Sequence, residues 1–205
     1  MADRLAIYRG ALRLLGNAAG LSSLTETNPT RFRLDEAWEP AVNYLLAKGL
    51  WNFAMRSVEL SNDEDVEPLF GRLYAFSKPD DWVRTAAISQ DGSFREGYEE
   101  YEDETGWWYA DIDPLYVRYV SNDEEYGWNV GSWRQPFAKT IEAYLAYESG
   151  LAISSDKGNR NDLYSVFTKL LKEAKTLDAV DERVQKSPVG RLVRARLVSG
   201  SRRAR

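Results

Sequence analysis

The hydrophobic and polar positions of the chain follow a helical period at its two ends and a strand-like period in the middle. Apolar residues recur every three or four positions in four stretches, which predicts helices over about residues 3–15, 34–48, 136–153 and 161–178. Between the second and third stretches, short apolar runs alternate with polar residues and are separated by Gly, Asp and Asn clusters. This pattern favours an antiparallel meander over about residues 51–122. We therefore predict an α+β fold in which a bundle of four helices carries an inserted antiparallel β-region.

The period changes at the segment Leu-Trp-Asn-Phe-Ala-Met-Arg, residues 50–56. The helical phase runs up to Gly49, and a glycine just past the last periodic residue is a usual helix stop. Trp51 and Phe53 then alternate with smaller or polar neighbours, which predicts the start of a strand. Pro40 is placed close enough to the start of the preceding helix to be tolerated there. Large aromatics at such a change of period fill the seam between packed layers, so we predict a structural junction formed by Trp51, Phe53, Pro79, Asp80 and Trp82.

Charge is distributed unevenly along the chain. Residues 183–205 hold eight Lys or Arg and no acid, whereas residues 1–182 hold 19 bases against 32 acids, a balance of −13. Residues 91–125 alone carry twelve acids and two arginines. Because affinity for nucleic acid comes mainly from cations that neutralise phosphates, we expect the acidic body to repel nucleic acid.

The basic C-terminal segment also carries an apolar stripe. Ser187-Pro188 is a typical helix start, and Val189, Leu192, Val193 and Leu197 line one side of the short helix that it predicts. Such a helix cannot bury its apolar side alone. We interpret the segment as a docking peptide for a partner; a solvated polybasic end and a nucleic-acid-binding arm are the alternatives.

The composition excludes several kinds of catalytic and cofactor site. The chain has no cysteine and no histidine, which removes Ser-His-Asp and Cys-His catalysis and zinc sites built on thiolate or imidazole. It has no phosphate-binding glycine loop and no dinucleotide-binding fingerprint. No window approaches the ~20 apolar residues that a membrane span needs, so we expect a soluble protein without a cofactor.

Two acidic regions invite a chemical interpretation. The carboxylates of residues 99–104, Asp111 and Asp113 lie near Trp107, Trp108 and Tyr109, as in a carbohydrate-binding or carbohydrate-cleaving site, but residues 98–104 lack the apolar wall that would raise a carboxyl pKa. Residues 111–113 and 121–125 could offer oxygen ligands to calcium, but neither fits an EF-hand loop. We favour a solvated acidic hairpin and predict that the chain is not an enzyme and holds no metal.

Four sequence elements occur in the order and spacing of a known family. They are Trp51-Asn52-Phe53-Ala54, the aromatic-rich run from Leu73 that ends in Pro79-Asp80-Asp81-Trp82, the strand-like Leu115-Tyr116-Val117-Arg118-Tyr119-Val120, and Trp133, Pro136 and Phe137 followed by an Ala-rich helix over residues 145–153. Together they resemble the head-to-tail adaptors of short-tailed bacteriophages, of the tail tubular protein A type. The resemblance covers about residues 34–180.

The resemblance implies a homomeric ring of about twelve copies in the neck of the virion, assembled in the host bacterial cytoplasm. The ring would join the portal protein to the tail nozzle protein and prolong the DNA channel, through which DNA passes without sequence-specific binding; no membrane is involved. Residues 1–182 would form the adaptor domain and residues 183–205 a tail that grasps the portal. The residues then expected to dock on the portal are Val189, Arg191, Leu192, Val193, Arg194, Arg196, Leu197, Arg202 and Arg203.

Overall fold

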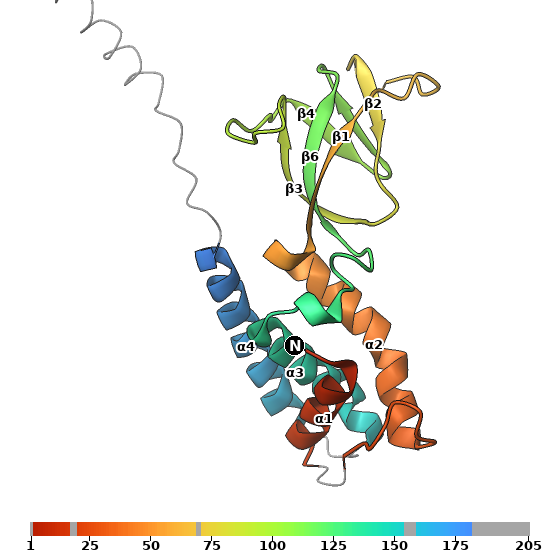
Figure 1. Cartoon of the computed structure of the whole chain (residues 1–205), viewed down its shortest axis with the longest axis vertical. Helices are drawn as coiled ribbons and strands as arrows, with labels where there is room; N and C mark the ends of the chain where they lie inside the picture. The colour runs from red at the N-terminus through yellow and green to blue at the C-terminus, as the bar shows by residue number, and fades with distance from the viewer. Residues whose placement is uncertain (1, 17–19, 69–70, 154–158, 182–205) are drawn as a thin grey trace, which may run out of the picture.

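The computed structural model describes residues 2–16, 20–68, 71–153 and 159–181 (Figure 1). In these residues the chain forms four helices and two small antiparallel sheets, so the predicted α+β class is confirmed. The helices are α1 (Arg4–Leu14), α2 (Pro29–Lys48), α3 (Gln135–Ile153) and α4 (Asn159–Asp181). The strands are β1 (Met55–Leu60), β2 (Tyr74–Ser77), β3 (Trp82–Ser89), β4 (Tyr101–Glu104), β5 (Trp107–Ala110) and β6 (Leu115–Ser121).

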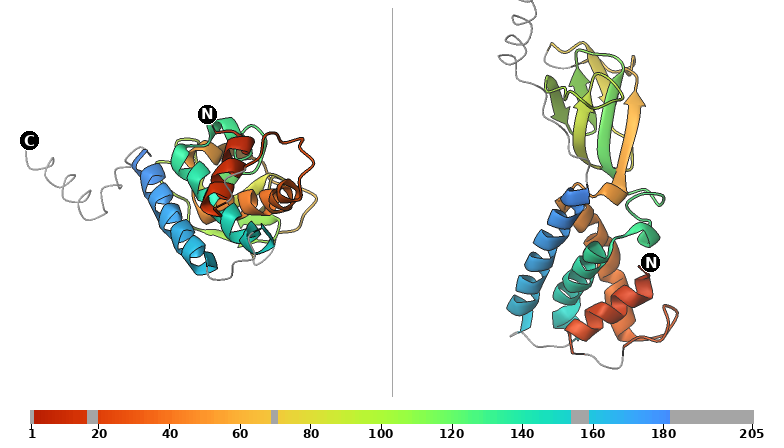
Figure 2. Two further views of the ribbon diagram at one scale, coloured as in Figure 1. Left: turned by 90° about the horizontal axis from the view of Figure 1, so that it is seen from below. Right: turned by 60° about the vertical axis from the view of Figure 1, so that its left-hand side comes forward.

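The four helices form what we call the helical base, with α3 at its centre. Helices α1, α2 and α4 all pack on α3 (Figure 2). The apolar positions that predicted α2 are buried in this base, including Leu34, Val42 and Leu45, which are fully buried. No described helix combines the length and the apolar character needed to cross a membrane.

Helix α2 begins five residues earlier than the sequence pattern predicts. The side chain of Asn28 accepts a hydrogen bond from the Thr30 amide at 2.9 Å, and Pro29 occupies the first helical position. Both features favour a helix start, but they lie in a polar stretch that resembles a connection. Pro40 is therefore well inside the helix rather than near its start. The predicted ends of α1 and α3 agree with the structure to within one residue, and α4 extends two to three residues further at each end.

The six strands form what we call the β module, residues 55–121. One sheet has the strand order β1-β6-β3 and the other the order β2-β5-β4. The predicted meander is therefore wrong, because the first and last strands pair with each other along their whole length. Among the paired strands, only β4 and β5 are joined by a tight turn. The other strand pairs are brought together by burial of apolar side chains. Strand β6, in the middle of its sheet, completely buries Leu115, Val117, Tyr119 and Val120.

A narrow junction connects the helical base to the β module (Figure 1). We call it the waist and define it as residues 49–56, 78–84, 119–137 and 174–181. Trp51 and Phe53 do not begin a strand, because residues 52–54 form a single turn of 3₁₀-helix and β1 starts at Met55. The indole N–H of Trp51 donates to the Leu45 carbonyl oxygen at 2.7 Å, which folds the ring back over the end of α2.

Candidate functional site at the waist

A chain of aromatic rings joins the elements that meet on the helical side of the waist. Phe137 at the start of α3 contacts Trp51, Phe53 and Trp133, with ring centroids 4.8, 4.7 and 5.1 Å away. Trp133 in turn stacks on Trp38 of α2 at 5.7 Å. Trp51, which is 1% exposed, and Phe53 thus lie in the seam where the sequence predicts a junction. Edge-to-face contacts of this kind stabilise beyond the apolar area that they bury, so they strengthen the waist.

One carboxylate holds the β side of the waist together. Asp81, just before β3, accepts hydrogen bonds from Arg56 of β1 at 2.9 Å, from the hydroxyl of Tyr119 of β6 at 2.9 Å, and from the hydroxyl of Ser121. Burial alone would raise the pKa of Asp81, but the bonds from Ser121, Arg56 and Tyr119 outweigh it and lower that pKa below its ordinary value. Burial, followed by the bond to Asp81, raises the pKa of Tyr119. Asp81 is therefore an ionised tie between three strands.

The other residues of the predicted junction lie around this tie. Asp80 is exposed, and within the described residues its carboxylate accepts no hydrogen bond and forms no ion pair, whereas its neighbour Asp81 is the tie. The carbonyl of Pro79 accepts the Trp82 amide at 2.9 Å and closes the turn. The indole of Trp82 donates to Thr85 at 3.1 Å. The sequence pattern could not show whether Asp80 or Asp81 points into the junction, because neither lies in a periodic run of apolar residues that would fix the direction of its side chain.

The end of α4 is fastened to the waist by polar contacts. The backbone N–H of Asn52 donates to the Asp178 carboxylate at 3.0 Å, and the Asn52 side chain donates to the Asp178 carbonyl at 2.7 Å. Asp178 is 6% exposed, and Arg134 forms an ion pair with Asp181. A hollow of about 190 Å³ beside Trp51 lies between these contacts. Helix α4 therefore ends at the waist, and no sequence pattern indicated the pairing of Asn52 with Asp178.

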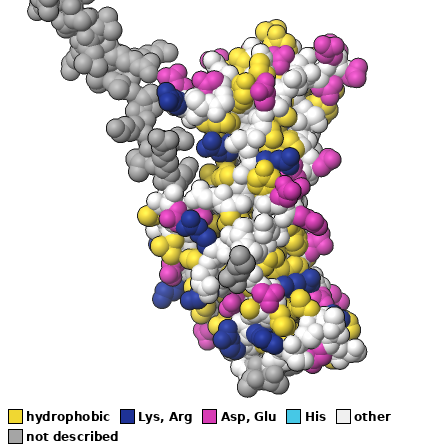
Figure 3. All heavy atoms as spheres, viewed as in Figure 1, with side chains coloured by type: hydrophobic (Ala, Val, Ile, Leu, Met, Phe, Trp, Pro, Cys, Tyr) yellow, Lys and Arg dark blue, Asp and Glu magenta, His cyan; other side chains and the backbone are white. Residues whose placement is uncertain are grey.

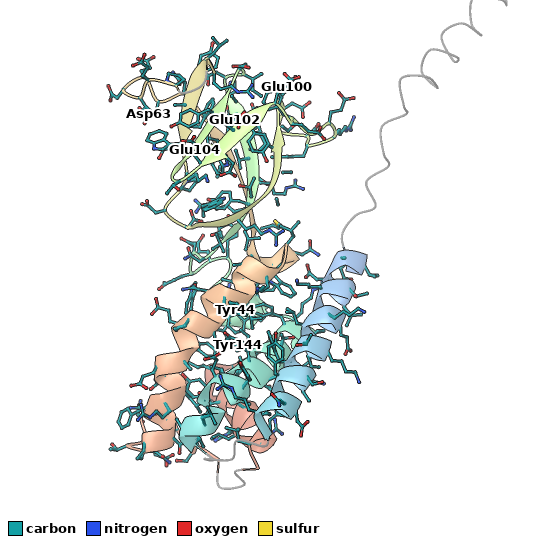
Figure 4. The ribbon with its side chains drawn as sticks, turned by 180° about the vertical axis from the view of Figure 1, so that it is seen from behind. Tyr44, Asp63, Glu100, Glu102, Glu104 and Tyr144 are labelled. Atoms are coloured by element: carbon teal, nitrogen blue, oxygen red, sulfur yellow. The ribbon has the colours of Figure 1, made fainter. Side chains whose placement is uncertain are left out.

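The acidic residues gather at the free end of the β module. Figure 3 shows carboxylates over this end, and Figure 4 places Asp63 and Glu100 near it, with Glu104 lower on the β module. Part of this charge is paired, because Arg72 contacts Asp111 at 2.9 Å and Glu102 at 3.1 Å.

The two tryptophans of the predicted carbohydrate alternative differ in exposure. Trp108 is fully buried, and its indole donates to Asp103 at 3.2 Å, so it offers no ring face to a sugar. Trp107 is half-buried.

The two predicted calcium candidates shape loops instead. Asp113 accepts the Asn62 amide at 3.2 Å, and Asp123 accepts the Glu125 amide at 2.8 Å. Within the described ranges, no three His, Cys, Asp or Glu side chains lie close enough together to hold a metal ion. The predicted portal-docking residues, Val189 to Arg203, lie outside the described residues.

The functional interpretation rests on the geometry of the waist, because comparison with known proteins gives no match. No protein-family model matches the chain, and no curated protein matches it. Of the described groups, Tyr8, Tyr119 and Tyr144 have the most strongly raised pKa values, in each case mainly through burial. The Tyr8 hydroxyl donates to Asp35 of α2 and the Tyr119 hydroxyl to Asp81, so these two hydroxyls link different elements. The contacts at the waist are suited to holding the helical base, the β module and the end of α4 together.

Proposed function

We propose that the chain is a structural head-to-tail adaptor of a bacteriophage particle, which joins the portal to the tail nozzle as a ring of about twelve copies. The observation that supports this most is the convergence of the family-like segments. Parts of these segments, residues 50–56, 78–84, 119–120 and 133–137, are far apart in the sequence but meet at the waist through Asp81 and Phe137. The remaining parts, residues 73–77, 115–118 and 145–153, lie in the β module and the helical base. Such convergence means that these segments together support one structural feature, the joint between the two modules.

The arrangement of the modules also fits an adaptor. A helical bundle with an inserted β-region gives the subunit two separate ends, one helical and one made of strands (Figure 2). We propose that the β module faces the nozzle or neighbouring copies, and that residues 183–205 dock on the portal. The fastening of α4 at Asp178 supplies a firm base from which a docking peptide can act.

Assembly is the proposed mechanism. The acidic body keeps free subunits apart in solution, because like charges repel. The docking peptide folds when it binds the portal, and this coupling costs ordering entropy that its apolar stripe and arginines must offset. Display of identical sites around the portal then raises the effective concentration of neighbouring subunits and closes the ring. An acidic channel would also let DNA pass without adhering.

Portal binding of point variants tests this function. We would mix the chain with the portal protein encoded in the same genome and separate free from bound protein by size-exclusion chromatography. Replacing Leu192 and Leu197 with Asp places charge on the apolar stripe and should abolish co-elution. Replacing Ser199 and Ser201 with Asp adds the same charge beyond the stripe and should preserve it. If both pairs of substitutions behave alike, the stripe is not the docking surface, and if the unaltered chain never co-elutes, the adaptor function fails.

A further inference from the structure

Three cations from three different elements meet beside the waist. Lys48 is the last residue of α2, Arg84 lies on β3 and Lys175 lies on α4. The Arg84 guanidinium donates to the carbonyl oxygen of Ala47 at 3.4 Å, which places it next to Lys48. The Nζ atom of Lys48 lies over the ring of Tyr44, 4.5 Å from its centroid. We call Lys48, Arg84 and Lys175 the cation cluster.

The fastening of α4 brings Lys175 close to the other two cations. Asp178, about one turn further along α4, accepts the backbone N–H of Asn52, which follows the end of α2 by four residues. Helices α2 and α4 therefore end close together at the foot of the β module (Figure 2). Partial burial, and then the charges of Arg84 and Lys48, lower the pKa of Lys175, as expected where like charges lie close together. All three residues of the cluster are exposed to solvent.

Within the described residues, no carboxylate offsets the charge of the cluster, because none of its three cations forms an ion pair. The two aspartates near the end of α4 have other partners, since Asp178 accepts a backbone N–H and Asp181 pairs with Arg134. Glu173 lies two residues before Lys175 on the helix and therefore does not face it. The cation cluster is thus a positive site on an acidic body.

Stabilisation of helix ends explains only two members of the cluster. Cations near the C-terminus of a helix interact favourably with its dipole, and Lys48 and Arg84 both lie at the end of α2. Lys175 lies six residues before the end of α4, outside its last turn, so it gains no such stabilisation. Its charge instead adds repulsion toward Lys48 and Arg84. An anion bound between the three side chains would relieve this repulsion.

A phosphate group fits the cluster better than a carboxylate does. A phosphate monoester carries about −1.5 to −2 charge at pH 7 and three strong acceptor oxygens, whereas a carboxylate has one charge and two oxygens. Apart from its bond to Ala47, the Arg84 guanidinium makes no hydrogen bond within the described residues. Its planar fork can therefore bond two phosphate oxygens at once, while Lys48 and Lys175 add point charges.

We propose that Lys48, Arg84 and Lys175 form a binding site for a phosphate group beside the waist. The phosphate is either free in solution or part of a nucleic acid, and these two sources share the chemistry that the cluster recognises. Bound phosphate links the end of α2, strand β3 and helix α4 at the joint between the helical base and the β module. It should therefore stabilise the folded chain. This inference goes beyond the proposed function and requires neither a portal nor a ring.

Binding of inorganic phosphate to the full-length chain tests the proposal. Isothermal titration calorimetry at constant ionic strength gives the Kd, and thermal unfolding in phosphate and in chloride gives the accompanying rise in Tm. Lys175→Gln removes one charge of the cluster and should weaken phosphate binding by at least about tenfold. Lys169→Gln makes the same change at another exposed lysine of α4, outside the cluster, and should leave the Kd unchanged. In chloride, Lys175→Gln should unfold no earlier than the unaltered chain, because repulsion is lost.

Oligonucleotides separate the two sources of phosphate. A short thymidylate with a free 5′-hydroxyl presents only backbone phosphates, and the same oligonucleotide with a 5′-phosphate adds a terminal one. If the first binds and Lys175→Gln weakens its binding, the site takes the nucleic-acid backbone. If only inorganic or terminal phosphate binds, the site takes a free phosphate group. Both results support a phosphate site.

Four results would overturn the proposal. Absence of saturable phosphate binding shows that the cluster is not a phosphate site, and equal Kd values for Lys175→Gln and Lys169→Gln show that phosphate binds elsewhere. A lower Tm of Lys175→Gln in chloride shows that this lysine stabilises the fold itself. A native mass of the free chain that falls on Lys175→Gln shows that the cluster contacts a second copy. No portal is present in these samples, so none of these results depends on whether the chain is an adaptor.

Discussion

Replacement of Asp81 by Asn isolates the role of the tie between strands β1, β3 and β6. The substitution preserves side-chain shape but removes the charge and turns one acceptor oxygen into an N–H₂ donor. Three donors, from Arg56, Tyr119 and Ser121, then face a group that can accept fewer of them. Asp80→Asn is the matched control, because it makes the same chemical change at the next residue on an exposed side chain.

The magnitude follows from the burial of the donors. Tyr119 and Ser121 are fully buried, and a buried group left unsatisfied costs about 1–3 kcal/mol. Arg56, with 35% of its side chain exposed, can regain water and contributes little. Since Asn keeps one acceptor oxygen, one of the two buried hydroxyls is left unsatisfied, and we expect Asp81→Asn to lower the free energy of unfolding by about 1–3 kcal/mol. For a chain of this size that corresponds to a fall in Tm of roughly 2–12 °C.

Thermal and urea unfolding, followed by circular dichroism, measure this loss for both variants. Asp80→Asn should stay within about 0.5 kcal/mol of the unaltered chain. The lowered pKa of Asp81 means that its stabilisation is present above the unfolded pKa and is lost as pH falls through the folded pKa. The gap between Asp81→Asn and the unaltered chain should therefore shrink below about pH 4. Equal stability of the two Asn variants at pH 7, or a gap that does not change with pH, would refute the assignment.

Two further substitutions test other contacts of the fold. A Cβ at Gly127 would overlap the carbonyl oxygen of Ser121, so Gly127→Ala should lower the free energy of unfolding, measured in urea, by about 1–3 kcal/mol. The control Gly97→Ala adds a Cβ that meets no atom within 4 Å and should not destabilise the fold. Equal effects of the two substitutions would contradict this packing. Burial under α1 raises the pKa of Glu142, so its ionised form is penalised in the folded state and stability falls as pH rises through that range. Glu142→Gln should therefore be more stable than the unaltered chain at pH 7, with the difference vanishing near pH 4, and a less stable variant at pH 7 would show that the carboxylate is needed.

Helices could be predicted from the sequence wherever burial alone sets the pattern. In α2 the predicted apolar positions are buried, but the helix start was missed because Asn28 and Pro29 lie in a polar stretch without periodic apolar residues. In α4 the predicted stripe includes Val166 and Leu177, which are 39% and 45% exposed. Periodicity identifies residues that share a helix face, but it does not say how much of that face a neighbouring element covers.

The candidate site was predictable only in its aromatic part. The change of period at Trp51 and Phe53 indicated a seam, and both rings lie in it. The polar ties could not be found, because Asn52 and Asp178 are 126 positions apart and their hydrogen bonds leave no local pattern. Strand pairing failed for the same reason, since the partnership of β1 with β6 depends on burial across the whole β module.

The most direct measurement of adaptor function is the native mass of portal rings mixed with the full-length chain, alongside a version that ends at Glu182. With a subunit of 23.4 kDa, about twelve added copies should raise the mass of the portal ring by roughly 280 kDa. The shortened version should leave the mass of the portal unchanged. If the full-length chain adds no mass, or if the shortened version adds as much, the chain does not join a portal through its C-terminal segment.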